Sequence, residues 1–200
     1  TQTTRRYLMK HSWRLLLSLV TAALLLAGCS TLHQKQGEWI FNPRDGSWGG
    51  TADAVKDMQD VWIEFQSTVT QQPVKLHALW HPAPKRDAPV LMYLHGARWN
   101  VTGSAFRIQR MRDLGFHVLA VDYRGFGRTS QETPSESMAY EDALAAWQWL
   151  AVAHPGKQRF IFGHSLGGAV AIELASQVHD ERGTIVEGLA DLSTGSMAED

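Results

Sequence analysis

The sequence predicts an α/β fold with a mostly parallel sheet that is preceded by an antiparallel hairpin. From residue 89 onward, short apolar runs typical of buried strands alternate with helical patterns, and this alternation favours a parallel sheet with helices on both faces. One such run, residues 160–162, leads directly into a Gly-x-Ser-x-Gly box (Gly163, Ser165 and Gly167) and then into an apolar helical pattern. We therefore expect a strand, a sharp turn that carries a serine, and a helix.

The hairpin is predicted by two stretches with a period of two. Val61, Ile63 and Phe65 alternate with polar or amphipathic residues, and the same alternation returns between residues 74 and 80 after a turn at 71–73. Prolines interrupt the chain between residues 82 and 89. Residues 89–94 are then almost continuously apolar, as expected for a strand buried on both faces.

The remaining elements follow from caps, breakers and periodicity. We predict a helix over 104–113 that is capped by Ser104 and stopped by Gly115, and a buried strand over 116–121. Thr133 and Glu136 have the spacing of a capping box, with Pro134 at the first helical position. This second helix is expected to end at 154–156, a third to cover 169–178, and a last strand to begin at 184–186. The predicted buried face of the second helix consists of Tyr140, Leu144, Trp147 and Leu150.

The N-terminal region resembles an export signal. Basic residues precede an apolar run over 15–27, which is too short to span a bilayer but suits a signal peptide. The run ends in Leu-Ala-Gly-Cys, which resembles the lipobox of bacterial lipoproteins, and lipidation accounts for Cys29, the one cysteine in the sequence. Ser30, in the position directly after the cysteine, resembles the residue found there in lipoproteins sorted to the outer membrane. We therefore expect a lipid anchor on the periplasmic face of the outer membrane. The alternative is a signal peptide with an incidental cysteine.

These patterns divide the chain into four parts. We predict an upstream extension over 1–8, a signal peptide over 9–28, a tether and lead-in over 29–58, and an α/β domain over 59–200. Within the lead-in, Trp39, Phe41 and Trp48 are expected to pack over the domain edge. A net charge of −1 gives no electrostatic indication of a nucleic-acid partner.

Three motifs follow three predicted parallel strands. The carboxyl ends of parallel strands meet at one edge of a sheet, so we expect the three motifs to converge there. They are Leu-His-Gly at 94–96, Asp-Tyr-Arg-Gly-Phe-Gly at 122–127 and Gly-His-Ser-Leu-Gly-Gly at 163–168. Together they resemble the α/β-hydrolase superfamily, in particular lipid-active and thioester-cleaving serine hydrolases. The resemblance covers about residues 60–190. It implies the α/β-hydrolase fold, here lacking the last strands.

The resemblance also implies site residues. Ser165 is the expected nucleophile, and the backbone N–H groups of Ala97 and Leu166 are the expected oxyanion donors. His95 and Gly96 would shape the oxyanion loop. The alternative, without catalysis, is a glycine-rich turn with an incidental serine.

The expected acid and base are harder to place, because the superfamily has both after the nucleophile. His179 is the one histidine that follows Ser165, and it lies at the far end of the predicted helix. His164 and Asp122 are expected to be structural. Asp191, and less so Glu187, are candidate acids. The sequence ends at residue 200, where the superfamily continues with two further strands, and we therefore expect an incomplete domain, an unprotected edge strand and poor solubility.

Two classes of function remain open. The first is a serine hydrolase that cleaves carboxylic esters or thioesters through an acyl-enzyme, and the second is a catalytically incomplete, lipid-anchored scaffold or binding protein. Peptidase or acyltransferase chemistry is also compatible with the same fold. The histidines show no clustered ligand spacing and no glycine-rich phosphate loop is present, so no metal or other cofactor is expected.

Overall fold

A computed structural model describes residues 20–21, 40–43, 52–178 and 188–191. Several sequence predictions lie outside these residues: the extension over 1–8, Cys29, Trp39, Trp48, His179, Glu187, and most of the signal peptide. The predicted strand start at 184–186 also lies outside them. Within the described residues, no helix is long and apolar enough to cross a membrane.

The described strands form one sheet in the order β1-β2-β4-β3-β5-β6. The predicted hairpin is β1 (Gln59–Gln66) and β2 (Pro73–His81), paired antiparallel with Ile63 opposite Leu76. Strand β2 also runs antiparallel to β4 (His117–Val121). Strands β3 (Val90–Leu94), β5 (Arg159–His164) and β6 (Gly188–Asp191) run parallel to β4, so their carboxyl ends share one edge.

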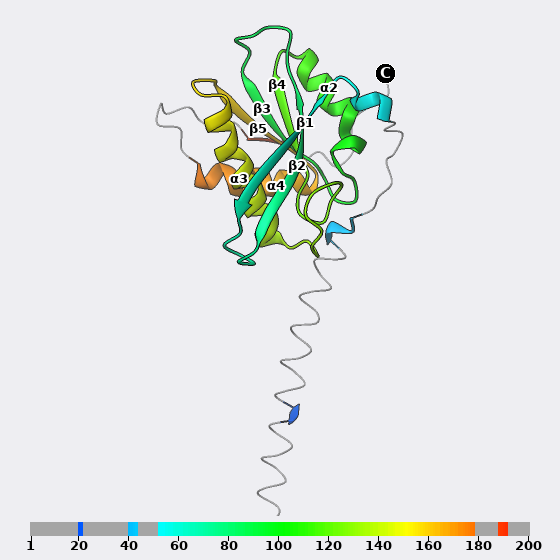
Figure 1. The fold of residues 1–200 in the computed structure, drawn as a ribbon, viewed down its shortest axis with the longest axis vertical. Helices are drawn as coiled ribbons and strands as arrows, with labels where there is room; N and C mark the ends of the chain where they lie inside the picture. The colour runs from blue at the N-terminus through cyan, green and yellow to red at the C-terminus, as the bar shows by residue number, and fades with distance from the viewer. Residues whose placement is uncertain (1–19, 22–39, 44–51, 179–187, 192–200) are drawn as a thin grey trace, which may run out of the picture.

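Helices cover both faces of the sheet, as Figure 1 shows. Helix α2 (Ala105–Asp113) lies on one face, where Ile108 packs with Leu91, Tyr93 and other side chains of β3 and β4. Helices α3 (Glu136–Ala153) and α4 (Leu166–Gln177) lie on the other face. The mixed sheet with helices on both sides is the predicted architecture, because alternate side chains of each buried strand need an apolar partner on each face.

The larger core lies under α3 and α4. It contains Trp147 and Leu150 of the predicted helical face, while Tyr140 and Leu144 pack against its margin. Phe41 also belongs to this core and is only 2% exposed. The prediction that the lead-in packs against the domain is therefore confirmed at Phe41, although that residue lies upstream of the predicted boundary at 59.

Two local predictions were wrong. Helix α3 begins two residues later than the capping-box pattern implied, because Ser135 caps it by accepting a hydrogen bond from the Met138 N–H. Ser104 precedes α2 without a side-chain capping bond, and Asn100 instead caps the short 3₁₀ turn η2 (Val101–Ser104). The candidate acid Asp191 is the final residue of β6, where it pairs in register with His164.

Candidate active site

Ser165 lies in the turn between β5 and α4, with the backbone angles φ 54° and ψ −119°. A positive φ is rare for a residue that carries a side chain, and its cost is tolerated where the surrounding fold dictates the turn. The turn leaves the serine side chain exposed to solvent. The sharp, strained turn that the Gly-x-Ser-x-Gly box predicted is therefore present.

The two glycines of the box permit this turn because no side chain fits at either position. A methyl group on Gly163 would lie 2.1 Å from the Gly167 carbonyl oxygen, and one on Gly167 would lie 2.1 Å from the Leu94 carbonyl oxygen. Both contacts are with backbone, which cannot move aside cheaply. The start of α4 thus packs directly against the ends of β5 and β3.

The same close packing brings the loop after β3 beside the nucleophile candidate. A methyl group on Gly96 would lie 3.2 Å from the Ser165 Cβ. Within the described part of the chain, no hydrogen bond from the Ala97 N–H is found, and Leu166 is the first residue of α4, so its N–H has no intrahelical partner. Two backbone donors are therefore available on the segments that flank Ser165.

His95 is fully buried in this loop and is held by its surroundings. Its Nδ1 donates to the Gly96 carbonyl oxygen at 2.7 Å, and its ring packs on Tyr123 and Phe126 at centroid distances of 4.6 and 5.0 Å. Burial lowers the pKa of His95, although the charge of Asp122 acts in the opposite direction. Its Nε2 lies 3.4 Å from an Asp122 oxygen without forming a hydrogen bond. The ring is thus fixed within the loop at 95–97, and its expected part in shaping that loop stays a prediction.

Asp122 connects three segments rather than facing Ser165. Its Oδ1 accepts from the Val101 N–H at 2.8 Å, and its Oδ2 lies 3.3 Å from Nδ1 of His77 on β2. The other ring nitrogen of His77 lies 2.8 Å from Asp60. Burial lowers the pKa of His77, but the hydrogen bonds to Asp122 and Asp60 outweigh it and leave this pKa raised. The geometry favours the structural interpretation of Asp122.

A buried ion-pair cluster at Arg124 was missed by the sequence reasoning. The Arg124 side chain is 0% exposed, and its guanidinium donates to Asp142 at 2.8 Å and to Glu141 at 2.6 Å, both on α3. It also donates to the Ser67 hydroxyl at 3.0 Å. The one indication in the sequence was the adjacent acidic residues Glu141 and Asp142 in the predicted helix. Acidic side chains on a helix are usually exposed to solvent, so this pair did not indicate a buried ion pair.

The structure does not complete a catalytic triad within the described residues. No hydrogen bond to the Ser165 hydroxyl occurs among them, and His179 and Glu187 fall outside them. Asp191 ends the strand adjacent to β5, so its backbone lies at the same sheet edge as Ser165. In the part of the chain that the structure describes, no group of three or more His, Cys, Asp or Glu side chains is placed to hold a metal ion.

Residues 40–43 form part of the site region, which the sequence reasoning did not predict. The Phe41 carbonyl oxygen accepts from the N–H of Arg98 at 2.9 Å, directly after the loop at 95–97, and the Phe41 ring lies 6.4 Å from that of Phe126. Arg98 has a positive φ of 77°. The lead-in therefore contacts the loop that carries the Ala97 N–H.

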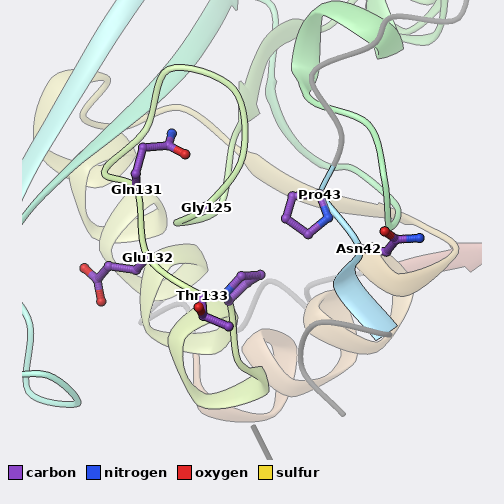
Figure 2. Close-up of a pocket in the computed structure, with 7 residues that line it drawn as sticks. Asn42, Pro43, Gly125, Gln131, Glu132 and Thr133 are labelled. Atoms are coloured by element: carbon purple, nitrogen blue, oxygen red, sulfur yellow. The ribbon is translucent and has the colours of Figure 1, made fainter. Parts of the chain in front are cut away.

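Two hollows border this segment. Figure 2 shows the larger one, of about 490 Å³, with Asn42 and Pro43 on one side and residues 131–133 on the other. The smaller one, of about 190 Å³, lies between α3 and α4 and is lined by Ile40, Phe41, Glu136, Ala139, Tyr140, Leu166, Ala169 and Val170.

A mixed sheet in this strand order, parallel from β4 to β6, with a strained serine at the β5–α4 turn, defines an α/β-hydrolase fold. The family model described as Hydrolase_4, serine aminopeptidase S33, matches residues 85–192, more than half of the sequence. The chain therefore belongs to this family of the α/β-hydrolase superfamily.

Known proteins support the same assignment. The lysophosphatidylserine lipase ABHD12 of Danio rerio is 37% identical over 125 residues, which are 56% of this chain and 32% of the relative. The human protein ABHD12B is 32% identical over 135 residues, 66% of this chain and 37% of the relative. The chain thus spans about a third of the length of these curated relatives.

Solved structures show the same fold. An esterase of Pyrococcus furiosus is 26% identical with a TM-score of 0.55, and the alignment covers 68% of this chain and 50% of the esterase. A carboxyl esterase of Bacillus coagulans is 23% identical with a TM-score of 0.50, and the alignment covers 66% of this chain and 42% of the esterase. At that identity the second likeness concerns the fold alone.

Proposed function

We propose that this protein hydrolyses carboxylic esters or thioesters through an acyl-enzyme on Ser165. The observation that carries the proposal is the exposed Ser165 in a strained turn at the N-terminus of α4. Its Oγ attacks the carbonyl carbon, and the tetrahedral intermediate collapses with loss of the alcohol or thiol. Water then attacks the acyl-enzyme, which releases the carboxylic acid and regenerates Ser165.

The Ala97 and Leu166 N–H groups are the proposed oxyanion donors. The Leu166 N–H, which has no intrahelical partner at the start of α4, the dipole of that helix and the contact of Gly96 with the elbow support this role. Loss of one such donor typically costs about 3–4 kcal/mol of transition-state stabilisation. Because the donors are backbone groups, their side chains contribute only through the shape of the loop.

The general base is not assigned to a described residue. His95 is buried with its Nδ1 committed to a carbonyl, and His77 lies between two carboxylates. Asp191 is the proposed acid, since its strand neighbours β5 and ends at the same edge of the sheet. An acid in that position would orient a histidine rather than act on the substrate itself.

The proposed substrates are small acyl esters or thioesters, by analogy with the lipase and esterases that the chain resembles. A second candidate is peptide-bond hydrolysis, which the family description as a serine aminopeptidase favours. The two candidates differ in the leaving group, because an amine must be protonated as it leaves and a thiolate need not be. Matched 4-nitrophenyl ester and 4-nitroanilide substrates of one acyl group therefore separate them.

We also propose that Cys29 is lipidated and holds the protein at the periplasmic face of the outer membrane. Ten residues separate Cys29 from Ile40, and the eleven Cα-to-Cα steps between them span at most about 40 Å when fully extended. The sheet edge with Ser165 would then stay near the bilayer surface. Palmitate labelling that is lost in C29A supports this anchor, while labelling that persists in C29A excludes it.

Labelling by a fluorophosphonate tests the nucleophile. The full chain should be labelled, S165A should lose the label, and S176A should retain it. Ser176 is a suitable control because it is an exposed serine on the same helix, with its hydroxyl bonded to the Glu173 carbonyl. Label that survives in S165A refutes the role of Ser165, and a folded wild-type chain that takes no label favours the non-catalytic scaffold.

A further inference from the structure

The smaller hollow beside the elbow has an apolar wall with few polar groups. Phe41, Ala139 and Val170 are buried in it, and Leu166 is half-buried. Its polar members, Glu136 and Tyr140, already pair with each other, since the Tyr140 hydroxyl donates to the Glu136 carboxylate at 2.5 Å. The same hydrogen bond raises the pKa of Tyr140 to about 12. Among the described residues that line it, the hollow therefore offers no unpaired buried side-chain donor that would recognise a polar ligand.

The position of this hollow connects it to the nucleophile. Leu166 lines it and directly follows Ser165, and Ala169 and Val170 lie one turn further along α4. An alkyl chain bound in the hollow would therefore have its outer end beside Ser165 and the Leu166 N–H. The opposite wall comes from Ile40 and Phe41 of the lead-in, whose carbonyl contacts the loop at 95–97 through Arg98.

The volume of the hollow limits the ligand. It measures about 190 Å³, and apolar cavities of about 150 Å³ stay dry and take up a molecule the size of benzene. A hollow of this size holds about six hydrocarbon heavy atoms, because each occupies roughly the volume of a water molecule, about 30 Å³. The small side chains of Ala139 and Ala169 keep this space open, because larger side chains at either position would fill it.

We propose that this hollow binds the alkyl part of the acyl group, a single unbranched chain of about six carbons, and that Ile40 and Phe41 of the lead-in form its outer wall. The proposal rests on the proposed ester hydrolysis and adds the substrate class. It also gives the lead-in a part in specificity, in addition to its proposed part in tethering.

Binding is tested without catalysis by NMR of the full chain with labelled Leu, Val and Ala methyl groups. Titration with hexanoate should shift the Leu166 and Val170 signals saturably. The dissociation constant should fall about fourfold for each added methylene from propionate to hexanoate, and then level off. A169L should abolish the shifts, whereas A151L, an equal enlargement at an exposed position of α3, should retain them.

Reaction rates form the second arm of the test. Hexyl fluorophosphonate should label Ser165 at least tenfold faster than methyl fluorophosphonate, and A169L should remove this preference whereas A151L should keep it. If neither probe labels the wild type but hexanoate binds as described, ester hydrolysis fails and the binding site stands. If hexanoate leaves these methyl signals unshifted, or if the two probes react equally fast, the alkyl site is refuted.

Discussion

Replacement of Arg124 by methionine should strongly destabilise the fold, because it leaves charged groups buried without a partner. The Arg124 guanidinium is 0% exposed, and Asp142, to which it donates at 2.8 Å, is also 0% exposed. The Arg124 N–H donates to the same carboxylate at 2.8 Å. Methionine has a similar length but no charge. Removal of one partner of a buried ion pair typically costs about 3–5 kcal/mol, and we expect R124M to lose that much free energy of unfolding.

The exposed ion pair of Arg128 provides the matched control. Arg128 lies 2.7 Å from Asp60, with side chains that are 57% and 45% exposed, and such pairs contribute less than about 1 kcal/mol. Urea unfolding followed by tryptophan fluorescence compares R124M with R128M, and eight tryptophans supply the signal. Equal losses in the two variants would refute the reasoning.

The pH dependence of R124M provides a second check. Burial raises the pKa of Asp142, and Arg124 opposes this effect. Without Arg124 the folded-state pKa rises further above the unfolded value of about 3.9. The folded state then binds more protons than the unfolded state, so stability falls as pH rises through that folded pKa. R124M should therefore lose more stability at about pH 8 than at about pH 6, and a loss that is equal at both would contradict the burial of Asp142.

Three further predictions follow from the site. G167A places a methyl group 2.1 Å from the Leu94 carbonyl oxygen and should cost at least about 2 kcal/mol in urea unfolding, whereas G103A, with a side-chain neighbour at 3.3 Å, should cost less than about 1 kcal/mol. Burial raises the pKa of Glu141, but hydrogen bonds from neighbouring hydroxyl, amide and guanidinium groups outweigh it and lower this pKa to about 2. The stability difference between wild type and E141Q should thus be constant above about pH 4.5 and shrink as pH falls towards 2, as measured by urea unfolding across that range. F41A should slow fluorophosphonate labelling of Ser165 and cost about 3–5 kcal/mol, and F41L should recover most of both; unchanged labelling in F41A would separate the lead-in from the site.

The parts of the fold that the sequence predicted depend on local patterns. The alternation over 61–65 predicted β1, the continuous apolar run over 89–94 predicted β3, and the glycine box predicted the turn at Ser165. Each is encoded by neighbouring residues, because side-chain period and backbone freedom act within one element. The order of the three motifs then placed their strand ends at one sheet edge.

The parts that were missed depend on contacts between distant segments. Arg124 and Asp142 are 18 residues apart, and Phe41 contacts Arg98 across 57 residues. No periodicity records such pairs. The start of α3 was misplaced for a more local reason, since Thr133 and Ser135 both offer a capping hydroxyl and the structure uses the second.

The residues that the motifs made conspicuous differ in what they do. Asp122, His95 and Arg124 are buried, and each uses its polar atoms to hold a loop or helix against its neighbour. Ser165 is exposed and strained, and its hydroxyl has no hydrogen bond within the described residues. Buried polar groups are tolerated when they are paired, and the Asp122 carboxylate and the Arg124 guanidinium thereby join the segment after β4 to η2, β2 and α3. The strained turn that presents Ser165 is held instead by the close backbone packing at Gly163 and Gly167, where α4 begins against the ends of β5 and β3.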